Sequence, residues 1–215
     1  MIEQCLTKLP DLDETTRLII THEWEMFQAV NNEGGRAACQ ENPSEFALMR
    51  AAQCFTWSPK IRQSWLDDLV QATTGNRNLM TEKYARMMSS TYPDEYALIA
   101  DALPPLSDTC LAYIEELVAI TVQWAEETAQ RYPAIAARGR PIHKSADTYQ
   151  TTSIETYAFA EYATYSQHTL ECMVQWLHEK NDEGVNLQLV ADEWLARCKG
   201  YENLQAANRA TLKKR

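Results

Sequence analysis

Apolar residues recur every three or four positions along most of the chain, and this spacing is the strongest constraint on its fold. Between Asp13 and Val30 they fall on one helical face, and between Leu111 and Trp124 they cover a wide arc of a helix. The 215 residues include only six glycines and eight prolines, which leaves little material for β-turns. We therefore predict an all-α fold, a helical bundle of seven to nine helices forming a single domain over residues 1–215.

Several helix starts are marked by a capping residue, in two cases followed by a proline that suits the first helical turn. These starts are Asn42-Pro43, Ser58-Pro59, Ser107 and Asn186. Thr152 to Glu155 has the pattern of a capping box and predicts one long helix from there to about Glu179. Between Tyr132 and Thr151 the helical pattern lapses, and the basic residues in this segment predict a solvated or functional loop.

The net charge of −10 argues against a general affinity for nucleic acid or for an anionic membrane. The six cysteines are scattered, without a C-x-x-C motif or metal-ligand spacing, which favours free thiols in a reducing compartment. Residues 1–10 lack the apolar core of a signal peptide, and no apolar run approaches the roughly 20 residues of a membrane span. We expect a cytoplasmic protein.

The stretch from Thr21 to Gln40 combines a helix end with an unusual set of polar residues. Glu23 lies at the edge of the apolar stripe, where a bare carboxylate would cost several kcal/mol, so it must be paired or protonated. Asn31 to Gly35 tolerate positive φ and end the helix. Two interpretations stay open: a glycine-stopped helix with a satisfied Glu23, or a site in which Glu23 or His22 is an acid/base and Arg36 binds an anion.

Polar residues interrupt other apolar faces in the same way. Arg50 and Gln53 interrupt the second helix, whereas Glu82 and Arg86 are four residues apart and are equally explained by an ordinary i,i+4 ion pair. Glu161, Tyr165 and His168 share a stripe of the predicted long helix, as a structural network or an acid/base relay. A polar pocket for a small anionic or zwitterionic molecule would account for all of these positions, because arginine recognises carboxylate or phosphate and amides fix orientation.

The candidate site therefore has two groups of residues and no metal ligands. The catalytic candidates are Glu23, His22, Glu161, His168 and Glu82. The substrate-binding candidates are Arg36, Asn31, Asn32, Gln40, Arg50, Gln53, Asn76, Arg77, Asn78, Arg86 and Tyr165.

Standard catalytic motifs are absent from the sequence. It has no glycine-rich dinucleotide or phosphate loop, no H-E-x-x-H and no G-x-S-x-G. A di-metal carboxylate bundle needs paired Glu-x-x-His motifs, and only the reversed His168-x-x-Glu171 occurs. Arg138 and His143 have the spacing of the motif in helical HEPN-type ribonucleases, but Gly139 and Pro141 disfavour a helix there.

Three long strings carry a resemblance to a known family: HEWEMFQAVNNEGGRAACQ, NRNLMTEKYARMM and SIETYAFAEYATYS. They resemble an uncharacterised bacterial family, domain of unknown function four-one-two-five, over nearly the whole chain. The resemblance implies no activity, cofactor or catalytic residue. It does suggest a possible nucleotidyltransferase-like protein partner, since relatives can occur beside such a domain.

Two functions follow from these observations. The first is a small-molecule enzyme or binder with Glu/His acid–base chemistry, in which Glu23→Gln leaves the fold intact but abolishes ligand binding or turnover. The second is a non-catalytic helical module that regulates or scaffolds another protein. Cofactor, substrate and reaction type are not specified by the sequence.

Overall fold

The computed structural model of the chain describes residues 1–31 and 35–213, and helices account for 73% of it. The all-α prediction is confirmed, and no strand occurs in these residue ranges beyond an isolated bridge between Thr148 and Thr151. The described residues form twelve α-helices, ten of them with seven or more residues, against the seven to nine predicted. The additions are the short helices α1 (Ile2–Leu6) and α8 (Pro133–Ala136) and a break in the predicted long helix.

The chain folds as two compact units, residues 1–82 and 83–215, with the boundary inside helix α5 (Leu79–Thr91). We call them unit 1 and unit 2 and describe each by itself. The prediction of a single domain is not tested by this division and stays a prediction.

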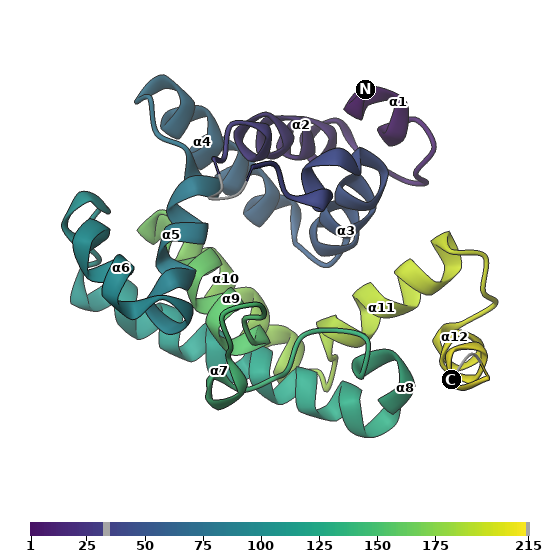
Figure 1. Cartoon of the computed structure of the whole chain (residues 1–215). Coiled ribbons are helices and arrows are strands. Elements are labelled where there is room, and N and C mark those ends of the chain that lie inside the picture. The colour runs from purple at the N-terminus through teal and green to yellow at the C-terminus, as the bar shows by residue number, and fades with distance from the viewer. Residues whose placement is uncertain (32–34, 214–215) are drawn as a thin grey trace. The chain divides into compact units, whose positions relative to one another are not determined.

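Unit 1 is built around helix α2, which packs against α3 and α4, while α1 packs against α2 and α3 (Figure 1). The bounds are α2 (Glu14–Gln28), the 3₁₀ turn η1 (Ala38–Glu41), α3 (Pro43–Phe55) and α4 (Pro59–Thr74). Ile19, Ile61 and Trp65 are fully buried between these helices. The predicted apolar stripe of the first helix faces the core at Ile19 and Met26, whereas Leu18 is exposed.

Side-chain caps fix where the helices of unit 1 begin. Asn42 and Ser58 accept hydrogen bonds from backbone N–H groups three residues on, as predicted. Asp13 does the same at the start of α2 and also pairs with Arg62. Burial raises the pKa of Asp13, but the hydrogen bonds from Thr16 and the charge of Arg62 outweigh it and lower the pKa below the ordinary 3.8.

Unit 2 is organised along α7, which packs against α8, α9, α10 and α11, while α12 packs against α8 and α11 (Figure 1). The remaining bounds are α6 (Pro93–Ile99), the turn η2 (Ala100–Ala102), α7 (Asp108–Arg131), the turn η3 (Lys144–Ala146), α9 (Ile154–Tyr162), α10 (Gln167–Asp182), α11 (Leu187–Cys198) and α12 (Leu204–Leu212). Ser107 and Asn186 cap α7 and α11 as predicted. Ile114, Leu117 and Leu170 are fully buried, which fits the wide apolar arc of α7.

The prediction of one long helix from residue 154 to about 179 is wrong. The chain leaves the helix after Tyr162 and begins α10 at Gln167, because Ser166 adopts an extended conformation and accepts a hydrogen bond from the backbone N–H of Thr169. No glycine or proline marks this break. A serine cap inside a continuous apolar pattern was enough to interrupt the helix.

The predicted capping box at Thr152–Glu155 is also wrong in detail. Ser153 is the residue that caps α9, through the backbone N–H of Thr156. The carboxylate of Glu155 accepts instead from the backbone N–H of Lys144 and so ties the preceding loop to α9. That loop matches the predicted lapse in helical structure, apart from α8 and the single turn η3.

Candidate functional site

Glu23 is the most completely enclosed charged residue of unit 1, with 0% of its surface exposed. Arg50 donates through Nε to Oε2 at 2.6 Å and through its NH2 group to Oε1. Trp65 donates its indole N–H to Oε1 at 2.8 Å, and Gln53 accepts from the NH1 group of Arg50 at 2.5 Å. Sequence reasoning predicted that Glu23 must be paired, and the pairing joins α2, α3 and α4.

In this network the predicted site residues Glu23, Arg50 and Gln53 are hydrogen-bonded to one another, so no ligand is needed to satisfy them. Both oxygens of Glu23 accept from buried protein donors, and the fork of Arg50 matches the carboxylate in two places. Guanidinium does not lose its proton in proteins, so the pair offers no acid for catalysis at neutral pH. The arrangement fits a clamp that holds three helices together.

Other predicted residues of unit 1 satisfy the ends of helices. Gln40 is buried and donates to the backbone carbonyls of Phe27 and Val30, where α2 ends. Asn78 donates to the carbonyl of Met26 at 2.8 Å and also accepts from the first turn of α5. These side-chain amides donate to backbone carbonyls at the helix end, where the helix itself supplies no further N–H donors.

Glu82 pairs with Arg77 through both carboxylate oxygens, at 2.8 and 2.7 Å. Arg77 is exposed, whereas Glu82 is nearly buried at the start of α5. Arg86 lies in unit 2, where it donates to the carbonyl of Pro104 at 2.6 Å. The Arg77 partner of Glu82 was not predicted, and the predicted i,i+4 pair of Glu82 with Arg86 stays a prediction.

The remaining predicted residues of unit 1 lie at the surface. Asn31, Asn76 and Arg36 are exposed, and His22 is half-buried. Asn76 has φ 59°, so its amide side chain suits a left-handed turn after α4. Arg36 has 51% of its side chain exposed and bonds to Glu41 and Gln28, and its role as an anion contact stays a prediction. Asn32 lies outside the described residues.

Unit 2 contains a second buried ion pair, and this one includes groups that exchange protons. Lys83 is 3% exposed, and its Nζ donates to Glu161 Oε2 and to the Tyr157 hydroxyl, each at 2.5 Å. The Tyr165 hydroxyl donates to the other oxygen of Glu161 at 3.2 Å. We call Lys83, Tyr157, Glu161 and Tyr165 the Lys83 cluster. It brings the predicted Glu161 and Tyr165 together, across the turn that ends α9.

A cation at the surface adjoins the Lys83 cluster. Arg140 is exposed, and its guanidinium carbon lies 4.8 Å from the centroid of the Tyr157 ring, while Lys83 Nζ lies 3.7 Å from the same centroid. The NH1 group of Arg140 donates to the backbone carbonyl and hydroxyl of Thr152. Tyr157 is half-buried, and its ring adjoins both the exposed Arg140 and the enclosed Lys83.

The loop that carries Arg140 is held firmly against α9. Asp147 accepts hydrogen bonds from the Ser90 hydroxyl, the Thr156 hydroxyl and the Ser153 backbone. Burial raises the pKa of Asp147, but these hydrogen bonds together outweigh it and lower the pKa below 3.8. Asp147 thereby links α5, α9 and the loop, while Arg140 is held by its own hydrogen bonds to Thr152.

His168 does not join Glu161 and Tyr165. The break between α9 and α10 places it in the first turn of α10, where it is exposed, and its Nε2 lies 3.8 Å from the Cys172 sulfur. The predicted row of Glu, Tyr and His therefore reduces to Glu161 and Tyr165. The row failed because it assumed that one helix continued through Ser166.

Sequence reasoning missed Lys83, Tyr157 and Arg140. Lys83 lies between Met80 and Met87, at the three- and four-residue spacing of an apolar face, so the rule that singled out Glu23 would have found it. Tyr157 lies four residues before Glu161, on the same face of the predicted helix, where a tyrosine is also an ordinary apolar contact. Nothing in the local pattern distinguishes Arg140 from its basic neighbours in the loop.

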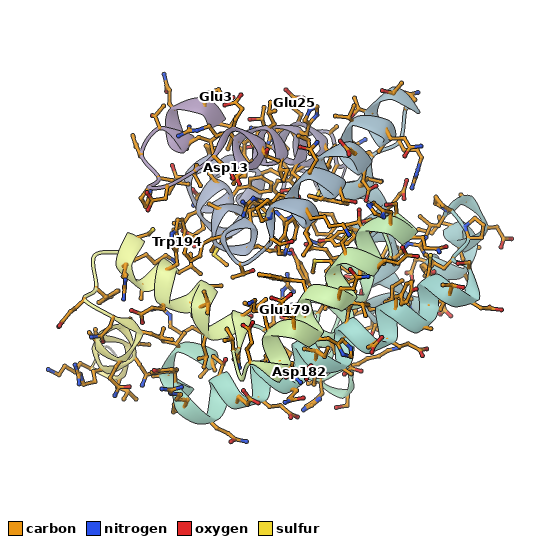
Figure 2. All side chains as sticks on the ribbon, turned by 180° about the vertical axis from the view of Figure 1, so that it is seen from behind. Glu3, Asp13, Glu25, Glu179, Asp182 and Trp194 are labelled. Atoms are coloured by element: carbon orange, nitrogen blue, oxygen red, sulfur yellow. The ribbon has the colours of Figure 1, made fainter. Side chains whose placement is uncertain are left out.

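Neither a metal site nor a membrane span is found in the described parts of the chain. Residues 1–31 and 35–213 contain no group of three or more His, Cys, Asp or Glu side chains placed to hold a metal ion. None of the helices described is long and apolar enough to cross a bilayer. Acidic side chains such as Glu3 and Glu25 lie on the outside of unit 1, and Glu179 and Asp182 are exposed on α10 (Figure 2).

Comparison with curated proteins and with solved structures finds no match to this chain. Residues 13–209 match the model of a family described as protein of unknown function (DUF4125). The match covers both units and confirms the resemblance carried by the three long strings of the sequence. The chain belongs to the DUF4125 family.

Proposed function

We propose that the chain is a small-molecule enzyme or binder for an anionic or zwitterionic metabolite, and that the Lys83 cluster is its acid–base centre. The observation that carries the proposal is the position of Lys83 Nζ, enclosed within hydrogen-bond distance of both a carboxylate and a phenol. Titratable groups held in contact away from bulk water are typical of acid–base sites.

The charges around Tyr157 support an anionic ligand. Lys83, which is paired with Glu161, and Arg140 both lie against the Tyr157 ring. The exposed guanidinium of Arg140 favours a carboxylate or phosphate as the ligand group beside this ring. Exposure falls from Arg140 through Tyr157 to Lys83, so a ligand held by Arg140 would have its other end near the enclosed amine.

The hydrogen-bond chain supplies the means to move a proton. Lys83 donates to one oxygen of Glu161, and the Tyr165 hydroxyl donates to the other. Transfer of the Lys83 proton to Glu161 leaves a neutral amine next to the Tyr157 hydroxyl. Both groups are then able to act on a bound molecule, as base and as acid.

Two arginines of the same loop provide a matched test. Arg140 contacts Tyr157 and Thr152, whereas Arg138 is exposed two residues earlier in the chain. Binding of inorganic phosphate, acetate, pyruvate and glutamate would be measured by thermal shift and equilibrium dialysis on the wild type, Arg140→Ala and Arg138→Ala. We expect at least one of these anions to bind, with affinity lowered roughly tenfold in Arg140→Ala, the loss of one charge-assisted hydrogen bond, and unchanged in Arg138→Ala. Equal affinity in both variants would refute the site, as would the absence of binding.

The second candidate function, a non-catalytic helical module, is favoured by a different observation. Leu18, Met49, Phe55 and Val70 are large apolar side chains that α2, α3 and α4 leave exposed in unit 1. The first partner to test is the nucleotidyltransferase-like protein that the family resemblance suggests. Met49→Glu would abolish such an association and leave anion binding unchanged, whereas loss of anion binding with the association intact would count against this candidate.

A further inference from the structure

The group at the centre of the Lys83 cluster is a primary amine, and a primary amine is also a nucleophile. Lys83 Nζ contacts Glu161 Oε2 and the Tyr157 hydroxyl, and it lies 3.7 Å from the centroid of the Tyr157 ring. Transfer of one proton to Glu161 makes the amine neutral without bringing a charge into the interior. Lysines that form Schiff bases with carbonyl substrates are typically desolvated or lie near another cation, and here Lys83 is enclosed and Arg140 adjoins the same ring.

The exposed guanidinium of Arg140 restricts which carbonyl compounds would suit Lys83. Within the described residues, Arg140 forms its hydrogen bonds through its NH1 group, which donates to Thr152. The fork of an arginine suits a carboxylate in a planar, bidentate geometry. Arg140 and Lys83 adjoin the same aromatic ring, and the groups that would suit them are a carboxylate for Arg140 and a carbonyl for Lys83.

We propose that Lys83 forms an imine with a small 2-oxo acid whose carboxylate is held by Arg140. This inference rests on the proposed function, since it names the substrate class and the reacting atom of the same site. Glu161 is the proton acceptor and donor, and the hydroxyls of Tyr157 and Tyr165 orient the two reacting groups. No metal or redox cofactor takes part in the step.

The atoms balance as follows. Lys83 gives one proton to Glu161, and the neutral Nζ attacks the carbonyl carbon, so that a C–N bond forms as the C=O π bond breaks. A second proton moves from nitrogen to the former carbonyl oxygen, which gives the carbinolamine. Glu161 then returns its proton to that hydroxyl group, water leaves, and the nitrogen lone pair forms the C=N bond of a protonated imine. The net change is the condensation of one amine with one carbonyl and the release of one water, with Glu161 again a carboxylate.

The experiment is reductive trapping of the full chain. The protein would be incubated with pyruvate, glyoxylate or 2-oxoglutarate and sodium borohydride, then digested, and each lysine assigned by peptide mass spectrometry. The exposed Lys60 and Lys144 are internal controls for non-specific reaction. We expect the reduced adduct on Lys83 in preference to both controls, and a roughly tenfold lower yield in Arg140→Ala, but not in Arg138→Ala, from the lost charge-assisted contact.

The outcomes separate this proposal from the one on which it rests. If the adduct on Lys83 is no more abundant than the adduct on Lys60, the proposal of an imine is wrong. If an anion still binds in equilibrium dialysis in that case, the proposed function stands without the imine. If no anion binds and no adduct forms, both fail. Because the adduct is mapped on the wild-type chain, the result does not depend on whether a Lys83 variant folds.

Discussion

Glu23→Gln distinguishes a structural clamp from a catalytic acid/base in unit 1. The substitution keeps the shape of the side chain but removes its charge and replaces one acceptor oxygen with an NH₂ donor. Arg50, which is 6% exposed, would then be a buried cation without its counter-charge. Breaking a buried ion pair from one side costs about 3–5 kcal/mol, so we expect the free energy of unfolding to fall by that amount.

A double-mutant cycle tests whether the cost comes from the pair itself. Glu23→Leu and Arg50→Met would each destabilise by a similar ~3–5 kcal/mol, because each leaves the other charge alone. The double variant removes both charges together with two hydrogen bonds, from the Trp65 indole to Glu23 and from Arg50 to Gln53, and the loss of such a bond at a buried group costs about 1–3 kcal/mol. The double variant should therefore be more stable than the sum of the single effects predicts.

The assay is urea unfolding followed by tryptophan fluorescence, since Trp24, Trp57 and Trp65 lie in unit 1. Glu25→Gln is the matched control, because Glu25 is exposed on the same helix (Figure 2) and its loss should change stability by less than ~0.5 kcal/mol. A Glu23→Gln protein as stable as this control would refute the clamp. It would also restore the original hypothesis, in which Glu23 is a catalytic group whose removal leaves the fold intact.

Three further predictions concern stability and pH. Burial raises the pKa of Asp192, although its hydrogen bond from Gln188 lowers it. The stability that the protonated form contributes is therefore lost as pH rises through the folded-state pKa. Asp192→Asn should stabilise the protein at pH 7, and paired thermal unfolding scans should show that this gain disappears in acid. Asp13 and Asp147 have lowered pKa values, so the stability that their charged forms contribute is present above about pH 4 and is lost as pH falls through the folded-state pKa values. Asp147→Asn should destabilise the protein at pH 7 and flatten the acid side of a plot of melting temperature against pH. An unchanged plot would contradict this linkage. Asn208 accepts from two backbone N–H groups at the start of α8, so Asn208→Ala should lower the free energy of unfolding by ~1–2 kcal/mol in urea titrations, whereas no loss would mean that this cap contributes nothing.

The helical fold was predictable because its causes are local. Asn42, Ser58, Ser107 and Asn186 cap the helices that their sequence neighbours predict, since the cap bonds to a backbone group only three residues away. The break at Ser166 was not predictable on the same grounds. There the apolar pattern continues while the backbone changes direction, and the helix gives way to tertiary packing.

The candidate site was predictable only in part, for a related reason. The apolar surroundings of Glu23 required it to be paired, hydrogen-bonded or protonated, and Glu161 was predicted to join a structural network or a relay; both are paired. Which partner each has could not be read from the sequence, because Arg50 is 27 residues from Glu23 and Lys83 is 78 residues from Glu161. Whether a polar residue on an apolar face is satisfied can be argued locally, but the identity of its partner depends on the assembled fold.

The chemistry of the two partners decides which ion pair is the better functional candidate. Arg50 keeps its proton at any physiological pH and holds Glu23 in a fixed fork, so that pair stores no exchangeable proton. The ammonium of Lys83 is a single donor atom on a flexible stem, in contact with a carboxylate and a phenol. Both pairs are equally buried and would be equally costly to break. Proton transfer is open to only one of them, and for that reason the acid–base proposal belongs to Lys83 and Glu161.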